Sequence, residues 1–180
     1  MNSWMWFLTR STGIVAGVLG VASLVWGLYF SARNTGTRLK PNWWLALHNF
    51  LGGLTLGFIA LHMLVSLLDT DIGLRFVDLL WPSSEVGWAI GWGVVAFWLF
   101  AIVVLPSVAR IRRRLKRKAW HLAHLLAVPA VVLSGVHAYQ TGSDSLSVWF
   151  TRGLALLVGI SIYPLTVRLL GLAQHRRVAA

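Results

Sequence analysis

The sequence has no cysteine and few charged side chains. The lack of cysteine excludes disulfides, thiolate metal sites, thioether-linked heme and cysteine-held iron–sulfur clusters. Only 12% of the 180 residues are charged, against about a quarter in a soluble domain. Hydrophobic residues make up 57% of the chain, and only five residues are acidic. This composition predicts an integral membrane protein rather than a soluble or nucleic-acid-binding one.

Five apolar stretches approach or exceed the roughly 20 residues that a membrane-spanning helix needs. They lie at residues 4–30, 43–68, 86–106, 119–139 and 148–170. We therefore expect an all-α bundle of about five transmembrane helices, forming a single domain over residues 1–180 with the lipid bilayer around it.

The loops between these stretches alternate in charge. Most of the 16 basic residues fall before the second stretch (Arg33, Arg38, Lys40), in the run at 110–118, and near the C-terminus (Arg168, Arg176, Arg177). The acids, Asp69, Asp71, Asp78, Glu85 and Asp144, fall in the other loops. By the positive-inside rule, the basic side is cytoplasmic. The pattern predicts a multi-pass protein of the cytoplasmic membrane, with the N-terminus outside and the C-terminus inside.

Four histidines lie inside the apolar stretches in two pairs of similar spacing. His48 and His62 are 14 residues apart, and His124 and His137 are 13 apart. Either spacing covers roughly 20 Å along a helix, much of a hydrocarbon core about 30 Å thick. Ionisable side chains are costly in a membrane, and imidazole is a common axial ligand of heme iron.

The second and fourth stretches run in the same direction, so they pair first histidine with first and second with second. This predicts two b-type hemes, one on His48 and His124 near the inner face and one on His62 and His137 near the outer face. The alternative is that each histidine is a buried polar residue bonded to neighbouring backbone. On an ideal helix, however, 13 residues leave His124 and His137 about 140° apart. Pro129, between them, can bend the helix.

Two further residues are candidates for contact with the hemes. Arg10 lies deep in the first stretch, where an arginine needs an anion; a propionate of the outer heme is one candidate, and snorkelling to the headgroups is the alternative. His121, one turn before His124, is expected to meet a propionate or the membrane interface, with direct ligation as the alternative. The outer acids Asp69, Asp71 and Asp78 could attract a cationic electron acceptor; the alternative is that they only avoid the cytoplasmic side and solvate a loop.

Together with these pairs, three motifs carry a family resemblance. They are Arg10-Ser11-Thr12-Gly13, Leu61-His62, and Trp120 four residues before His124. The chain resembles the ferric reductase-like transmembrane domain, which also forms the heme-bearing core of NADPH oxidases and of the membrane subunit of bacterial methionine sulfoxide reductase systems. The resemblance covers about residues 4–170 and implies a bundle of five or six helices with two b hemes on the four histidines.

The function expected from these features is electron transfer across the membrane. The donor would be a cytoplasmic flavoprotein or another donor, and the acceptor an outer ferric complex or soluble reductase. The alternative is a subunit that passes electrons from quinol to an extracytoplasmic reductase, as in the sulfoxide reductase systems. A third possibility is a non-redox membrane scaffold. We find no nucleotide-binding fingerprint, so we expect an oxidoreductase subunit that needs a partner.

Overall fold

The structure is a computed structural model that describes residues 3–31, 41–82, 85–143 and 145–178, and all the regular structure in these ranges is helical. Arg33, Arg38, Lys40 and Asp144, used above to orient the chain, lie outside the described residues. The elements in chain order are α1 (Ser3–Ser31), α2 (Pro41–Leu68), α3 (Phe76–Leu80), α4 (Trp88–Val104), the 3₁₀ turn η1 (Leu105–Ser107), α5 (Ala109–Arg112), α6 (Arg117–Leu125), α7 (Ala127–Thr141) and α8 (Val148–Val178).

Five helical segments in the described part of the chain are long and apolar enough to cross a membrane. They are Trp4–Ser31, Asn42–Leu68, Trp88–Ser107, Arg117–Thr141 and Val148–Gly171. The predicted fold class, an all-α membrane bundle of about five spanning helices, is confirmed. The fourth span is not one straight helix, because it consists of α6 and α7 with a break at Leu126.

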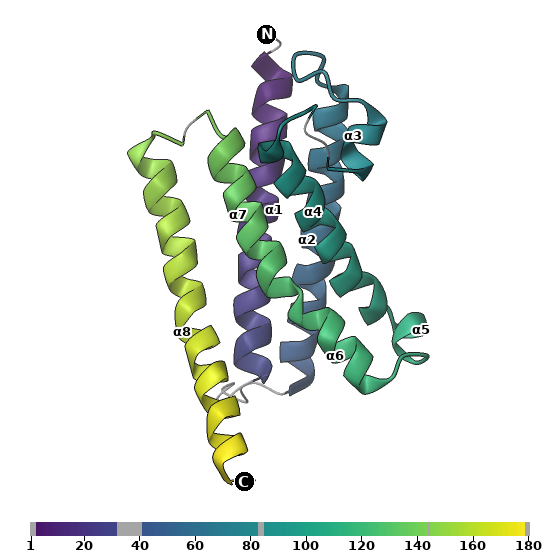
Figure 1. The fold of residues 1–180 in the computed structure, drawn as a ribbon, viewed down its shortest axis with the longest axis vertical. Helices are drawn as coiled ribbons and strands as arrows, with labels where there is room; N and C mark the ends of the chain where they lie inside the picture. Colours follow the sequence, from purple (N-terminus) through teal and green to yellow (C-terminus); the bar gives the residue numbers. More distant parts are fainter. Residues whose placement is uncertain (1–2, 32–40, 83–84, 144, 179–180) are drawn as a thin grey trace.

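The spanning helices form two hairpins. α1 packs mainly on α2, and α4 packs mainly on α7, while α8 contacts α1 at the edge of the bundle (Figure 1). The N-terminus and α3 lie at one end of the molecule, and the C-terminus and α5 lie at the other. We call these the acidic end, after the acids at 69–85, and the basic end, after the basic run at 110–118.

Proline and glycine mark several of the boundaries between helices. Pro41 occupies the first position of α2, where its missing N–H costs no helical hydrogen bond. Pro106 lies in η1, which ends the third span. Gly73 and Gly87 have φ of +68° and +85°, so they allow the chain to turn on either side of α3.

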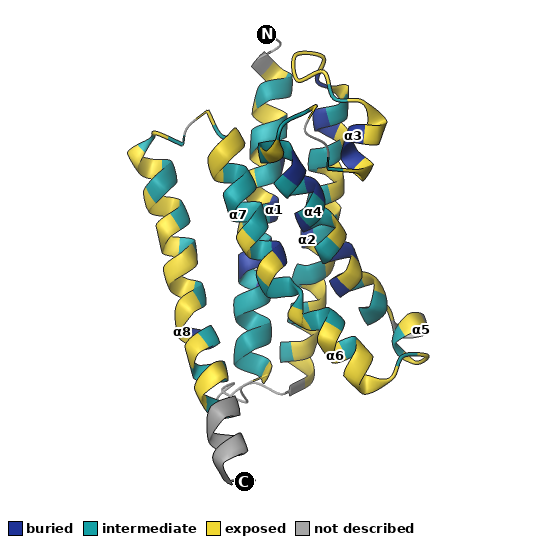
Figure 2. Ribbon diagram, in the orientation of Figure 1, coloured by how far each residue is buried: buried dark blue, intermediate teal, exposed yellow. Residues whose placement is uncertain are grey.

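The outward faces of the helices are apolar, and the buried residues concentrate on the inner faces of α1, α2 and α4 and around α3 (Figure 2). Large side chains such as Phe50, Leu61 and Leu156 are exposed along the middle of the spans. Large exposed apolar surfaces are rare on soluble monomers. On a bundle whose backbone groups are bonded within helices, this is the surface expected to face lipid.

Candidate functional site

The four intramembrane histidines come together as two facing pairs. His48 of α2 faces His124 of α6, with 5.8 Å between ring centroids and 68° between ring planes. His62 of α2 faces His137 of α7, with a separation of 6.2 Å and an angle of 73°. The pairing is therefore first with first and second with second, as the sequence indicated. We call His48 and His124 the basic-end pair, and His62 and His137 the acidic-end pair.

Backbone carbonyls of the adjacent helices orient three of the four rings. His62 Nδ1 lies 2.9 Å from the Thr9 carbonyl, His48 Nδ1 lies 3.2 Å from the Ser23 carbonyl, and His137 Nδ1 lies 2.8 Å from the Ala89 carbonyl. A carbonyl can only accept, so each Nδ1 must carry the proton and donate it. The other ring nitrogen, Nε2, is then left unprotonated and able to bind a metal.

Glycines on α1 and α4 make these close approaches possible. Gly13 lies against His62, Gly27 against His48, and Gly93 against His137. A Cβ atom at these three glycines would stand only 3.0, 2.9 and 2.8 Å, respectively, from the ring. The contacts of these glycines with the histidine rings were not predicted from the sequence. Gly13 and Gly27 are 14 residues apart, the same spacing as His48 and His62, and this repeated spacing was the available signal.

The break between α6 and α7 explains how His124 and His137, which are 13 residues apart, can both face α2, as they could not on one ideal helix. Leu126 has ψ of −9°, and its N–H bonds to the carbonyl of Ala123 as in a tighter 3₁₀ turn. Pro129 follows in the first turn of α7, so it has no N–H to offer the carbonyl four residues earlier. The change in helix direction lets both His124 and His137 face α2 instead of pointing about 140° apart.

The geometry of both pairs fits an iron held between two imidazoles. An iron–nitrogen bond of about 2 Å on each side, plus about 1 Å from each nitrogen to its ring centre, places two such centroids about 6 Å apart. The observed separations are 5.8 and 6.2 Å. Among the described residues there is no group of three or more His, Cys, Asp or Glu side chains that could hold a bare metal ion. Two ligands per site suit a metal whose other ligands come from a porphyrin.

A family model described as the ferric reductase like transmembrane component matches residues 16–135, which is two thirds of the chain and includes His48, His62 and His124. The chain belongs to the ferric reductase-like transmembrane family. Proteins of this family generally bind heme, and they act in membrane electron transfer. No curated protein and no solved structure matches the chain closely enough to count as similar.

In this ferric reductase-like chain, Arg10 lies near the acidic end of α1. It directly follows Thr9, whose carbonyl accepts from His62. Its guanidinium donates to Ser143 Oγ at 2.5 Å and lies over the Trp6 ring, 4.6 Å from the centroid. The contact of Arg10 with a propionate of the outer heme stays a prediction.

His121 does not join the basic-end pair. It is exposed on α6, and its ring lies 5.6 Å from that of Trp120. Trp120 instead stacks on His124, with 4.7 Å between centroids and 23° between planes. The guanidinium of Arg112 lies over the Trp120 ring, 4.7 Å from the ring centroid. His124, not His121, is therefore the partner of His48.

Two of the three acids that could attract a cationic acceptor have structural roles in the loop. Asp78 is buried, and it accepts hydrogen bonds from the backbone and the side chain of Arg75 at 2.8–3.1 Å. Asp69 is also buried, and it accepts from the backbone N–H of Asp71 at 3.1 Å. These contacts favour the interpretation in which the acids belong to the loop, and the attraction of a cationic acceptor stays a prediction.

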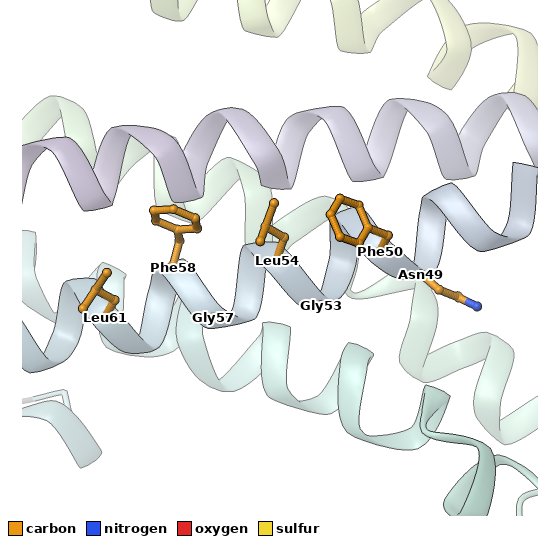
Figure 3. A pocket seen from close by; sticks show the side chains of 7 residues that line it. All are labelled: Asn49, Phe50, Gly53, Leu54, Gly57, Phe58 and Leu61. Carbon is orange, nitrogen blue, oxygen red and sulfur yellow. The ribbon is translucent and has the colours of Figure 1, made fainter.

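A groove of about 430 Å³ runs along α2, lined by Asn49, Phe50, Gly53, Leu54, Gly57, Phe58 and Leu61 (Figure 3). Nothing lies within 4 Å of a Cβ placed at Gly53 or Gly57. On an α-helix, these two glycines point about 140° and 180° away from His48. The groove is thus on the face of α2 opposite the histidines, and it is separate from both pairs.

Proposed function

We propose that this chain binds two b-type hemes and carries electrons between the two faces of the membrane. His48 and His124 would hold one heme at the basic end, and His62 and His137 would hold the other at the acidic end. One observation supports this most strongly. Within each pair, the two histidine rings face each other across the bundle at a separation that suits axial ligation.

The residues around each pair would prepare the imidazoles before any heme is bound. The carbonyls of Thr9, Ser23 and Ala89 hold the Nδ1 protons of three rings and leave Nε2 as the ligating atom. The glycines let α1 and α4 support the rings from behind. A heme held by these histidines would supply one-electron transfer.

Electrons would enter at the basic end and leave at the acidic end. The two histidines of α2 lie 14 residues apart, or about 21 Å along the helix, so the two sites together cover most of the hydrocarbon thickness. The basic run at 110–118 would face the cytoplasm. A cytoplasmic flavoprotein is the donor that we favour, with a ferric complex or a soluble reductase as acceptor outside. Quinol is the alternative donor.

Absorption spectra of the purified protein test the proposal. We expect a reduced b-type spectrum of a six-coordinate, low-spin heme, and two hemes per chain in a pyridine hemochrome assay. Replacing His48 or His124 with alanine should remove only one of them, and replacing His62 or His137 should remove only the other. A chain that binds no heme, or a high-spin five-coordinate spectrum in the intact protein, would contradict the proposal.

The donor is identified by anaerobic reduction of the loaded protein. We compare NADPH alone, NADPH with a soluble flavoprotein reductase, and a reduced quinone. Fast reduction only with the flavoprotein supports the favoured donor. Fast reduction by quinol, with none from the flavoprotein, places the chain with the quinol-dependent subunits instead. Rapid reduction by NADPH alone would overturn the need for a partner.

A further inference from the structure

The short helix α3, in the loop between the second and third spans, has an apolar outward side. Its large apolar side chains that are exposed, with that of the residue after it, are Phe76, Val77, Leu80 and Trp81. The two residues between them, Asp78 and Leu79, are buried. A cluster of large exposed apolar side chains is seldom presented to water and marks a surface that contacts a membrane or a partner.

Two contacts place the end of α3 beside α4 rather than above it. Trp98 Nε1 donates to the Leu80 carbonyl at 2.8 Å. Trp98 is ten residues into α4, or about 15 Å from its start, and a helical side chain covers the turn before its own Cα. A Cβ atom at Gly91 would lie 3.4 Å from Pro82 Cβ. The chain from Leu80 to Pro82 therefore runs along the first half of α4 (Figure 1).

The same turns of α4 support the acidic-end pair. Gly93, whose added Cβ would lie 2.8 Å from the His137 ring, falls between Gly91 and Trp98. The third candidate span begins at Trp88, so these turns lie on the membrane side of that boundary. The end of α3 is therefore at the level of a histidine pair within the spans.

The hydrogen bonds of α3 suit apolar surroundings. The last carbonyls of a helix have no partner within the helix, and in hydrocarbon no water can bond to them. The Leu80 carbonyl accepts from the indole of Trp98, and the Val77 carbonyl accepts from the backbone N–H of Trp81. Both carbonyls thus have a protein donor where a helix end in water would need none.

The charges of this segment lie at the other end of α3. Arg75, just before the helix, pairs with the buried Asp78 at 3.0 Å and with the exposed Glu85 at 2.9 Å. The carboxylate that is buried beside α3 is therefore neutralised, and the exposed ion pair lies toward the water. This leaves the apolar side of the helix free of unpaired charge, as entry into a bilayer requires.

We propose that residues 75–82 form a re-entrant segment: α3 enters the acidic-end leaflet beside α4, its apolar side contacts the acyl chains of the lipids, and Trp98 anchors it there. This inference goes beyond the proposed electron transfer and does not depend on heme binding. A water-soluble electron acceptor would then have to reach the acidic-end pair from another side of the bundle.

The occupant of the apolar side is lipid rather than a soluble partner protein, because this side continues the lipid-facing surface of the bundle. Trp88 and Trp98, which lie on α4 on either side of the contact with Pro82, are themselves exposed. A protein that covered Val77 and Leu80 would have to enter the bilayer beside the third span.

Spin labels on single introduced cysteines test the position of α3, since the chain has no native cysteine. In vesicles of phosphatidylcholine alone, labels at Val77→Cys and Leu80→Cys should relax mainly with oxygen, which concentrates in the bilayer, as a label at the exposed Leu156→Cys of α8 does. The matched control is Thr70→Cys, exposed in the same loop, which should relax mainly with a water-soluble nickel chelate. Relaxation of the two α3 labels by nickel to the same extent as Thr70→Cys would overturn the proposal.

Trp98→Phe tests the anchor. The substitution keeps an aromatic ring but removes the indole N–H, so the Leu80 carbonyl would have no donor in apolar surroundings. The response to nickel of the label at position 80 should rise. Trp92→Phe, on the same helix and beside Trp88, is the control and should leave it unchanged. No rise in Trp98→Phe, or an equal rise in Trp92→Phe, would overturn the anchoring role of Trp98.

Photolabelling of the unaltered chain covers the case in which a cysteine variant does not fold. An apolar diazirine dissolved in the bilayer should label residues 76–81 on irradiation, as it labels the middle of α8, and should spare residues 69–73. Labelled spans together with an unlabelled α3 would refute the inference. A protein that binds no heme contradicts the proposed function, whereas an α3 exposed to water contradicts only this inference.

Discussion

At the scale of single residues, the arrangement of the paired histidines depends on glycines in the neighbouring helices. Gly13, Gly27 and Gly93 let three imidazoles lie directly against neighbouring helices. Each ring is held on one side by a carbonyl and directed on the other toward its partner. A ring held in this way has no room to retreat from an added methyl group.

Gly13→Ala should therefore reduce heme binding at the acidic end and spare the basic end. Its Cβ would stand 3.0 Å from His62 Cε1 and 3.1 Å from Nδ1, closer than such contacts normally are. We expect the heme content to fall from two per chain toward one, as measured by pyridine hemochrome. Gly17→Ala is the control, because nothing lies within 4 Å of its added Cβ on the same helix. Equal heme content in both variants would count against the arrangement described for His62.

At the scale of elements, the break between α6 and α7 sets the directions in which His124 and His137 point. The sequence predicted one continuous span at 119–139, because hydropathy does not change at the break. Pro129 indicated a distortion, but it did not indicate its direction. That direction depends on Leu126, whose conformation is fixed by how α6 and α7 pack against α4. Such tertiary contacts leave no local trace in the sequence.

Pro129→Ala should weaken the binding of one heme. Alanine restores an N–H to the first turn of α7, so α6 and α7 can join into one straighter helix. His124 and His137 would then approach the ideal separation of about 140° around the axis, and both could not face α2. Heme loss on dilution or on mild heating should be faster than in the parent protein. Pro164→Ala, inside α8, should bind both hemes normally; similar behaviour of the two variants would argue against a role for the break.

The short helix α3 is held at the acidic end by Asp78. Hydrogen bonds from the Arg75 side chain and backbone lower the pKa of Asp78 below its usual value. Because the pKa is lower in the folded loop than in the unfolded chain, this carboxylate stabilises the loop above its unfolded pKa, and the stabilisation is lost as the pH falls through the folded pKa. Glu85 also pairs with Arg75, but it is exposed, so its contribution should be small.

Acidification should therefore loosen the segment at 69–82 in the parent protein. Hydrogen exchange of this segment is expected to accelerate as the pH falls through the Asp78 titration. Asp78→Asn should exchange quickly at neutral pH and show little further change on acidification. Glu85→Gln should behave like the parent. An Asp78→Asn protein that retains the full pH dependence would assign the effect to another group.

At the scale of the whole molecule, the sequence predicted the helical bundle and the pairing of the histidines. Hydropathy is a strong signal for spanning helices, and two parallel spans with matched histidines leave one simple pairing. The supports on α1 and α4 were not predicted, since a glycine is informative only once its neighbour is known. The roles of Asp69 and Asp78 were not predicted either, because burial of a loop acid depends on how the loop folds back.

The last prediction concerns the orientation of the molecule, which sets the direction of electron flow. The chain has no cysteine, so single cysteines can be introduced without removing native ones. Thr70→Cys at the acidic end should react with a membrane-impermeant thiol reagent added outside intact cells, because by the positive-inside rule we expect the basic run at 110–118 to keep the opposite end in the cytoplasm. Lys116→Cys should react only after permeabilisation. Both native residues are exposed, so poor reactivity from burial is not expected. The opposite labelling pattern would place the Trp120–His124 stack outside the cell, and electrons would then have to enter at the acidic end.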